Sequence, residues 1–289
     1  MNDRLFLLTS IHAALEAGKA ILQVYHSDFK VEVKVDKSPL TLADKRSHEI
    51  IINRLSKFDI PILSEEGKNV PYAVRKKWDT YGLIDPLDGT KEFVKKNGEF
   101  TVNIALIRRR KPLGGVVFVP DKGTLYFALN ELGSFKAHSI DLVEALDAEF
   151  VASLTGPTFS EENGHLDGML DKIIGRSKRL PMVSAPDRPF TIIGSRSHPS
   201  PELKEFVEAK RREYREVKLI SAGSSLKFCL VAEGGADIYP RTGPTMEWDT
   251  AAGQAIVENA GGRVLDYNTD DPLMYNKEKL LNPWFVVMG

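Results

Sequence analysis

The sequence contains one cysteine, Cys229, among 289 residues. A single thiol cannot form a disulfide within the chain or build a cysteine-based zinc site, so neither holds this fold together. Positive charge is not in excess either, because Lys and Arg total 39 against 40 for Asp and Glu. Such a chain lacks the field that recruits nucleic acid, and we expect no nucleic-acid partner. The lone thiol suits a reducing compartment, which predicts a cytoplasmic protein.

Long hydrophobic runs are also missing. We find no stretch of about 18 apolar residues, the length that a bilayer span requires. The apolar start of the chain continues past Ile11 with a helical period, and charge returns at Glu16 and Lys19. This pattern is typical of an amphipathic helix rather than a signal peptide. We expect no integral membrane segment, while peripheral membrane association stays open and the protein is expected to be a monomer or a homodimer.

The composition is that of a folded protein, with 42% hydrophobic and 27% charged residues over roughly two domains' length. Hydrophobic periodicity predicts helices over residues 4–25 and 41–58. Strands are predicted over residues 31–35, 61–64, 81–84, 102–107, 115–119 and 124–128. The last three follow one another closely with Gly and Pro between them, as in an antiparallel meander. Residues 1–150 are therefore predicted to form an α+β subdomain of helices packed on a sheet.

The pattern weakens over residues 155–189, where one helix is predicted near residues 165–174. We interpret this stretch as an inserted surface segment near a domain boundary. Strands are then predicted over residues 190–195 and 217–220, and helices over 202–214 and 226–233. Alternating strands and helices predict a layered α/β subdomain over residues 151–289.

Acidic residues occur where apolar strands end or a helix begins, which is where α/β proteins build sites. Glu65 follows one strand, Asp85 and Asp88 follow another, and Asp249 stands at a helix start. Each acid also has a structural explanation: a solvated turn, an Asx turn, or a first-turn acid favoured by the helix dipole. The stretch from Asp85 to Thr90 is harder to explain in this way, because it combines two acids with Pro, Gly and Thr in a rigid elbow.

Electrostatics decides what a cluster of these acids would need. Two carboxylates about 4 Å apart repel by roughly 4 kcal/mol at an effective dielectric constant near 20, so four or five cannot stay ionised together without cations. Oxygen ligands select Mg²⁺, Mn²⁺ or Ca²⁺ over zinc. Two such ions about 3.5 to 4 Å apart would clamp a phosphoryl group and activate a water molecule.

The stretches Leu63-Ser64-Glu65-Glu66, Asp85-Pro86-Leu87-Asp88-Gly89-Thr90 and Trp248-Asp249-Thr250-Ala251-Ala252-Gly253 resemble the inositol monophosphatase superfamily of Mg²⁺-dependent, lithium-sensitive phosphatases. The stretch Gly223-Ser224-Ser225-Leu226-Lys227 resembles one group within this superfamily in particular, the 3'(2'),5'-bisphosphate nucleotidases. The similarity covers nearly the whole chain except about residues 156–189. It implies a layered α-β-α-β-α sandwich with most metal ligands in residues 1–150. The last metal ligand and the substrate-binding residues would then lie in residues 151–289.

The resemblance implies two Mg²⁺ ions. The first would be held by Glu65, Asp85 and the carbonyl of Leu87, and the second by Asp85, Asp88 and Asp249. Asp85 would bridge the two ions. These ions would stabilise the charge on the attacking and leaving oxygens of an in-line displacement.

The resemblance also implies the catalytic residues. Thr90, next to Glu65, would orient and deprotonate the attacking water. Asp44 would assist as a base or at a third, weaker metal. The backbone N–H groups of Gly89 and Thr90 would bind the phosphate, and no covalent phosphoenzyme would be needed.

Substrate-binding residues are predicted in the second half of the chain. Ser224 and Lys227 lie three apart at a predicted helix start, where they would share one face suited to ribose and phosphate. Arg241 would pair a second phosphate, and Asp249 would also face the substrate. His198 would contact the nucleotide, although a turn with a capping role explains its segment equally well. Lys227 could instead be a solvated surface charge.

The predicted reaction is removal of the 3'-phosphate of 3'-phosphoadenosine 5'-phosphate to give AMP, with 3'-phosphoadenylyl sulfate as a second substrate. One alternative is an inositol monophosphatase or another small phosphomonoester hydrolase with the same metals. A haloacid-dehalogenase phosphatase is another, although Pro86 and Leu87 separate the acids here where that motif has one residue. A third alternative is a non-catalytic nucleotide or metal sensor.

Overall fold

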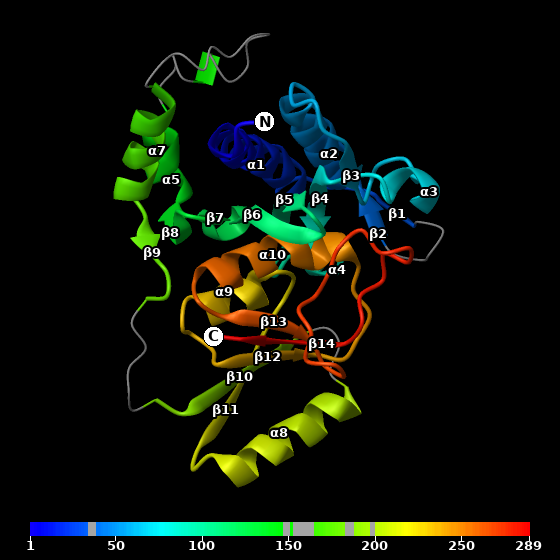
Figure 1. Cartoon of the computed structure of the whole chain (residues 1–289), viewed down its shortest axis with the longest axis vertical. Helices are drawn as coiled ribbons and strands as arrows, with labels where there is room; N and C mark the ends of the chain where they lie inside the picture. Colours follow the sequence, from blue (N-terminus) through cyan, green and yellow to red (C-terminus); the bar gives the residue numbers. More distant parts are fainter. Residues whose placement is uncertain (34–38, 147–150, 153–164, 183–187, 197–199) are drawn as a thin grey trace.

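The computed structural model describes residues 1–33, 39–146, 151–152, 165–182, 188–196 and 200–289. They stack as successive layers of helices, sheet, helices, sheet and helix, running from α1 and α2 to α8 (Figure 1). This order confirms the α-β-α-β-α arrangement that the family resemblance implies. The N-terminal helices α1 and α2 and the helix α8 therefore form the outside, and the two sheets enclose a middle layer.

The first sheet has seven strands in the order β3-β4-β5-β6-β7-β8-β9. They span Ile62–Ser64 (β3), Thr80–Asp88 (β4), Thr101–Arg108 (β5), Lys111–Val119 (β6), Thr124–Leu129 (β7), Gly133–His138 (β8) and Lys178–Arg179 (β9). β3 pairs with β4 in parallel, and the later pairs are antiparallel, which confirms the predicted meander. The central strands read as nearly continuous apolar runs because helices cover both faces of the sheet.

The second sheet has the order β11-β10-β12-β14-β13. Its strands span Phe190–Ser195 (β10), Val217–Ala222 (β11), Ile238–Arg241 (β12), Arg263–Asp266 (β13) and Phe285–Met288 (β14). β10 pairs in parallel with both β11 and β12, and the other pairs are antiparallel. The two strands predicted here from the sequence, β10 and β11, are confirmed.

The helices form the remaining layers. The longer ones are α1 (Asp3–Tyr25), α2 (Leu42–Leu55), α7 (His165–Gly175), α8 (Pro201–Glu213) and α10 (Glu247–Asn259), and the shorter ones are α3 (Tyr72–Arg75), α4 (Thr90–Val94), η1 (Pro120–Lys122), α5 (Ser139–Ala145) and α9 (Leu226–Ala232). A small hairpin, β1 (Val31–Val33) with β2 (Pro39–Thr41), precedes α2. α9 and α10 lie between the two sheets (Figure 1).

The middle layer approaches the first sheet closely at Gly115 of β6. A Cβ atom at this position would lie 2.8 Å from the Cα atom of Ala252 in α10. Real Cβ contacts are not that short, so glycine opposite a small helical residue allows α10 to lie directly on β6. This contact fixes the distance between α10 and the first sheet. The first turn of α10 contributes to the site described below.

The first helix, α1, corrects one expectation from the sequence. α1 is long and apolar enough to cross a membrane by length and composition alone. However, 78% of its most apolar 18-residue stretch is buried inside the protein, as in the core helix of a folded domain. It is buried around most of its circumference rather than along one amphipathic face, because it packs in the core under the first sheet.

The segment interpreted as a surface insertion is partly a core element. In its described part, α7 buries Leu166, Met169, Leu170 and Ile173 against the core under the first sheet. These residues recur at helical spacing and therefore share one face of the helix. β9 then adds a short strand beside β8. The surface interpretation is wrong for these residues, and the division at residue 150 stays a prediction.

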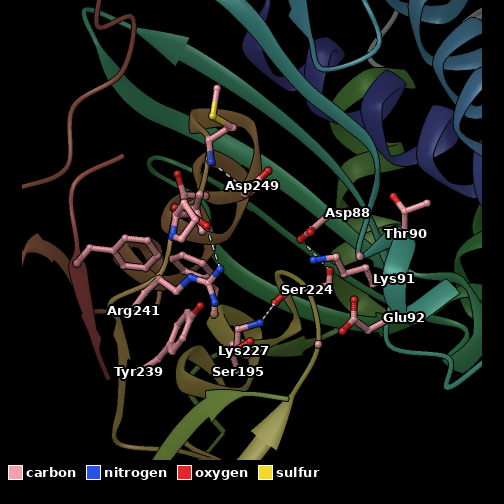
Figure 2. Close-up of a pocket in the computed structure, with 18 of the residues that line it drawn as sticks. Asp88, Thr90, Lys91, Glu92, Ser195, Ser224, Lys227, Tyr239, Arg241 and Asp249 are labelled. Atoms are coloured by element: carbon pink, nitrogen blue, oxygen red, sulfur yellow. Dashed lines mark hydrogen bonds between the residues drawn. The ribbon is translucent and has the colours of Figure 1, made fainter. Parts of the chain in front are cut away.

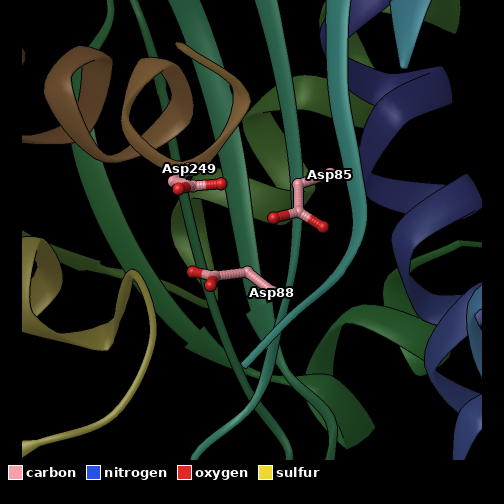
Figure 3. A group of neighbouring side chains, drawn as sticks. All are labelled: Asp85, Asp88 and Asp249. Carbon is pink, nitrogen blue, oxygen red and sulfur yellow. The ribbon is translucent and has the colours of Figure 1, made fainter. Parts of the chain in front are cut away.

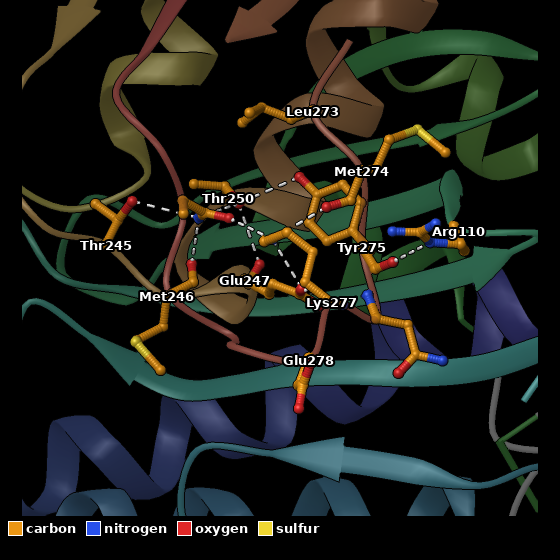
Figure 4. A network of polar contacts seen from close by, with 12 residues as sticks. Arg110, Thr245, Met246, Glu247, Thr250, Leu273, Met274, Tyr275, Lys277 and Glu278 are labelled. Atoms are coloured by element: carbon orange, nitrogen blue, oxygen red, sulfur yellow. Dashed lines mark hydrogen bonds and ion pairs between the residues drawn. The ribbon is translucent and has the colours of Figure 1, made fainter. Parts of the chain in front are cut away.

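A buried ion pair joins the C-terminal loop to the start of α10 (Figure 4). Glu247 is fully buried and accepts hydrogen bonds from the backbone N–H groups of Asn276 (2.7 Å) and Lys277 (2.9 Å). The Lys277 ammonium donates to the same carboxylate at 2.8 Å. Arg75 donates to the Asn276 side chain and to two backbone carbonyls of the same loop. This network holds the loop against the first turn of α10.

We expect Glu247→Ala to destabilise the protein by about 3–5 kcal/mol, because it leaves a half-buried ammonium and two backbone donors without their carboxylate. Urea unfolding of the purified variant measures this loss. Glu205→Ala, on the outer helix α8, is the matched control and should change stability by less than about 0.5 kcal/mol. Equal stability of the Glu247 variant and the wild type would contradict the structural role of the pair.

Candidate active site

Asp85 and Asp88 lie on one side of β4 because the strand contains a β-bulge. In the ladder with β5, Asp85 opposes Asn103 and Asp88 opposes Thr101, so two residues of β4 stand against one of β5 between these pairs. Side chains three apart in a regular strand point to opposite faces. The extra residue reverses this alternation and brings both carboxylates together. Pro86, which has no backbone N–H group to donate, occupies the bulge.

Asp249 joins them from the first turn of α10 (Figure 3). Its Oδ2 atom accepts a hydrogen bond of 2.8 Å from the backbone N–H of Met246, the residue that caps the helix. One carboxylate oxygen from each of Asp85, Asp88 and Asp249 lies within 4.8 Å of the other two. We call these three residues the acidic cluster, and it could hold a metal ion.

Glu65 lies beside the acidic cluster. β3 runs parallel to β4 with Ser64 opposite Ile84, and the N–H of Glu65 donates to the carbonyl of Ile84 at 3.1 Å. This register places Glu65 next to Asp85, close enough for Glu65 to raise the pKa of Asp85. Four predicted metal ligands from three separate parts of the chain therefore converge.

The acidic cluster is strained electrostatically in the absence of cations. Burial raises the pKa of Asp85 well above its usual range, and the negative charges of Glu65, Asp88 and Asp249 raise it further. Burial and the charge of Asp88 likewise raise the pKa of Asp249. The hydrogen bond from the Met246 N–H lowers this pKa and offsets only part of the rise. Oxygen donors in this arrangement suit a hard divalent cation, which would relieve the repulsion.

Thr90 and Asp44 also meet at the site. Thr41 caps α2, and its backbone N–H and hydroxyl each donate to Asp44 Oδ2 at 2.7 Å. The other carboxylate oxygen, Oδ1, lies 3.4 Å from the hydroxyl of Thr90, which is equally far from the carbonyl of Leu87. Gly89 precedes Thr90 with a left-handed φ of 87°. A Cβ atom there would lie 3.1 Å from Ser224 Cβ, so the turn favours glycine.

A cavity of about 490 Å³ lies beside these acids. Asp88, Gly89, Thr90 and Asp249 form part of its wall. Tyr239 and Arg241 lie on the opposite side of the cavity from Thr90 and Lys91 (Figure 2). Met246, Leu281 and Phe285 add apolar surface. The cavity is large enough for a small organic ligand and offers it acidic, cationic and apolar surfaces.

Two cationic side chains face this cavity from the second half of the chain. Lys227 is only 5% exposed, so its interpretation as a solvated surface charge is wrong. Its ammonium donates to the carbonyl of Ser224 at 2.5 Å, and burial lowers the pKa of Lys227 to about 8. Arg241 donates through Nη2 to the carbonyl of Pro244 at 3.0 Å. Within the described part of the chain, its buried Nε atom has no hydrogen-bond partner.

Ser224 and Lys227 do not share a helix face as predicted. Ser224 precedes α9 in a left-handed conformation with a φ of 54°, and only Lys227 is helical. The Ser224 hydroxyl donates to Asp88 Oδ2 at 2.8 Å. Ser195 lines the cavity, and the neighbouring Arg196 pairs with Glu99 instead. His198 lies outside the described residues.

Several residues at the site were not predicted. Asn103 and Thr101 of β5 and Ser225 before α9 form hydrogen bonds around Asp88. Asn103 interrupts the apolar stretch Val102–Ile107, and a polar residue inside a buried strand requires partners. This interruption was the signal available in the sequence.

The fold and this site agree with comparisons to known proteins. Residues 3–284 match the model of the inositol monophosphatase family, and the chain belongs to this family. This membership decides against the haloacid-dehalogenase alternative. The chain is 42% identical over 279 residues to the 3'(2'),5'-bisphosphate nucleotidase CysQ of Escherichia coli K12, covering 95% of this chain and 96% of that protein.

Solved structures give the same result. The crystal structure of CysQ from Bacteroides thetaiotaomicron superimposes with a TM-score of 0.82 at 46% identity, covering 98% of this chain and 96% of the other. An IMPase from Thermotoga maritima superimposes with a TM-score of 0.67 over 99% of this chain and 92% of its own. At 22% identity, this second likeness shows the fold alone.

Proposed function

We propose that this protein is a Mg²⁺-dependent phosphatase that removes the 3'-phosphate of 3'-phosphoadenosine 5'-phosphate to give AMP and inorganic phosphate. 3'-Phosphoadenylyl sulfate would be a second substrate. The observation that carries the proposal is the acidic cluster beside a cavity lined by the cationic groups of Lys227 and Arg241, in a chain 42% identical to a bisphosphate nucleotidase. A small phosphorylated nucleotide supplies the negative charges that such cationic groups would bind.

The residues present fit two Mg²⁺ ions. Glu65, Asp85 and the Leu87 carbonyl would hold the first, and Asp85, Asp88 and Asp249 the second, all through oxygen. When bound, the ions supply positive charge that neutralises the phosphoryl group and lowers the pKa of water. A third, weaker ion near Asp44 stays part of the proposal.

The chain's own residues would orient the attacking water. The Thr90 hydroxyl faces Asp44 Oδ1, which can accept its proton and so leave the Thr90 oxygen free to accept a hydrogen bond from water. Thr41 holds the other oxygen of Asp44 and thereby fixes the direction of the carboxylate. The N–H groups of Gly89 and Thr90 would bind the phosphate oxygens, and Glu65 would stand beside the water.

We expect Thr90→Val to lower kcat by about 10²–10⁴-fold, because the variant keeps the shape of the side chain and loses its hydroxyl. Thr90→Ser keeps the hydroxyl and should retain most of the activity. Steady-state kinetics at saturating Mg²⁺ compares the two variants with the wild type. A Thr90→Val enzyme with wild-type kcat would contradict the role of the hydroxyl.

Substrate selection would depend on the cationic side of the cavity. Lys227 and Arg241 would bind the phosphate that is not hydrolysed, since both charges lie away from the Thr90 side. Ser224 and Asp249 would contact the nucleotide near the hydrolysed phosphate. His198 stays a predicted nucleotide contact.

A phosphate-release panel tests the function. The purified protein is assayed with 3'-phosphoadenosine 5'-phosphate, 3'-phosphoadenylyl sulfate, 5'-AMP and inositol 1-phosphate, each with Mg²⁺, without it, and with added Li⁺. We expect the bisphosphorylated adenosine to have the highest kcat/KM, with release that requires Mg²⁺ and is inhibited by Li⁺. Preference for inositol 1-phosphate would favour the monophosphatase alternative, and tight binding without release would favour a sensor.

A further inference from the structure

The two oxygens of the Asp88 carboxylate have different surroundings. Oδ2 accepts hydrogen bonds from the Ser224 hydroxyl (2.8 Å), the Ser225 N–H (2.7 Å), the Ser225 hydroxyl (2.8 Å) and the Asn103 amide (3.4 Å). An ionised carboxylate oxygen offers about two lone-pair positions. These donors therefore occupy Oδ2 fully and leave Oδ1 as the atom available to a cation.

Asn103, on β5, stabilises this orientation of the Asp88 carboxylate. It is 1% exposed on β5, and its Nδ2 atom donates both to Asp88 Oδ2 and to the Ser225 hydroxyl oxygen at 2.9 Å. Its Oδ1 atom accepts a hydrogen bond of 2.9 Å from the Thr101 hydroxyl. The orientation of the amide is thus determined at both ends: its donors face oxygens, and its acceptor faces a hydroxyl.

The same hydrogen bonds connect Asp88 to the start of α10. The Ser225 hydroxyl lies 2.6 Å from the backbone carbonyl of Asp249 as well as 2.8 Å from Asp88 Oδ2. Its one proton is shared between these two acceptors, while Asn103 donates to its oxygen. Ser225 and Asn103 therefore join the first sheet, the turn before α9 and the first turn of α10 around the acidic cluster.

We propose that Asn103, acting with Ser225, is a positioning residue that fixes Asp88 so that its Oδ1 atom alone faces the metal, at a set separation from Asp249. This proposal rests on the proposed function, because it assumes that the acidic cluster binds Mg²⁺. Neither side chain is among the proposed metal ligands or phosphate contacts. Their effect is to restrict Asp88 to one orientation before the metal binds, so that less conformational freedom is lost on binding.

The test is a calorimetric titration of Mg²⁺ into the metal-free protein. We expect Asn103→Ala to weaken Mg²⁺ binding by about 10- to 100-fold, the effect typical of groups that orient metal ligands. Ser225→Ala should act in the same direction and less strongly, because the Ser225 N–H still donates to Asp88. In steady-state kinetics, the Mg²⁺ concentration for half-maximal activity should rise by the same factor.

Gln254→Ala is the matched control. Gln254 is also a buried amide, with hydrogen bonds to Glu258 of α10 and to Tyr275 of the following loop, and among the described residues it forms no hydrogen bond to the acidic cluster. Its loss should lower thermal stability and leave Mg²⁺ affinity unchanged. If Asn103→Ala does not fold, Asn103→Thr tests the same point, because threonine is a polar residue favoured in strands whose side chain is too short to bridge Asp88 and Ser225.

The outcomes separate this proposal from the proposed function. Wild-type protein that binds no Mg²⁺ would contradict the metal site itself. Wild-type and Asn103 variants that bind Mg²⁺ equally would leave the metal site intact and overturn the positioning role. A variant that loses stability as Gln254→Ala does, with no change in affinity, would show that Asn103 is only a buried polar residue of the core.

Discussion

Asp85→Asn is expected to lower kcat by about 10³-fold, and at the same time to make the metal-free protein more stable. The loss of activity follows because Asp85 would bridge both ions, and several kcal/mol of charge stabilisation correspond to about a thousandfold in rate. The gain in stability follows because Asp85 is fully buried among Glu65, Asp88 and Asp249, which raise its pKa together with burial. A neutral amide of the same shape removes that repulsion.

The pH dependence of stability provides a second measure of the same variant. The raised pKa of Asp85 means that the folded protein keeps a proton that the unfolded chain releases. Without metal, stability should therefore fall as pH rises from the ordinary pKa of an aspartate through the raised value. Asp85→Asn should weaken this fall, although Asp249 contributes to it as well.

Thermal unfolding in EDTA, followed by circular dichroism from pH 4 to pH 8, measures both effects. Relief of about 1–4 kcal/mol should raise Tm at neutral pH by several degrees. Asp79→Asn, at an exposed position just before β4, is the control and should change neither Tm nor kcat. An Asp85→Asn enzyme with wild-type turnover, or one less stable than the wild type in EDTA, would contradict the account of the acidic cluster.

Lys227→Met is expected to reduce selectivity for the second phosphate. A charge-assisted hydrogen bond to phosphate is worth about 1.5–3 kcal/mol, so kcat/KM for 3'-phosphoadenosine 5'-phosphate should fall by about 10- to 100-fold. Activity on a substrate with a single phosphate should change little. Methionine has a similar length and no charge to bury, so the variant should be at least as stable as the wild type.

The pKa of Lys227 predicts the direction of the pH effect. Burial lowers this pKa to about 8, so the ammonium loses its proton as pH rises through that value. In the wild type, kcat/KM for the bisphosphorylated nucleotide should therefore decline above about pH 8, because kcat/KM reports the free enzyme. Lys227→Met should lack this decline, and Lys218→Met on the exposed strand β11 should retain it. Identical pH profiles for the wild type and Lys227→Met would exclude this role.

Much of the site could be predicted from the sequence because its acids stand at recognisable ends of elements. The strand before Glu65, the strand that carries Asp85 and the helix that begins before Asp249 each have clear hydrophobic patterns. The helix predicted from residue 41 is confirmed as α2, with Thr41 at its cap and Asp44 in its first turn. Local patterns were sufficient here because each ligand sits within a few residues of a regular element.

What could not be predicted depends on contacts between distant segments. No local feature of the sequence shows that the bulge after Asp85 turns the Asp88 side chain to the same side of β4 as Asp85. Strand register is a property of the paired strands, not of one segment. Ser224 was assigned to a helix face, whereas its left-handed φ places its hydroxyl on Asp88. The helical spacing of α7 likewise does not show that Ile173 belongs to the core, because its burial depends on packing against α1 and α5, which are distant in the sequence.

The most direct test of the account is the dependence of thermal stability on Mg²⁺ concentration. A cation that binds only the folded state raises Tm in proportion to the logarithm of its concentration above Kd. The wild type should therefore gain stability as Mg²⁺ is added at pH 7.5, and Asp85→Asn should gain much less. A wild-type Tm that stays constant over the whole Mg²⁺ range would contradict the claim that these acids gather to hold divalent cations.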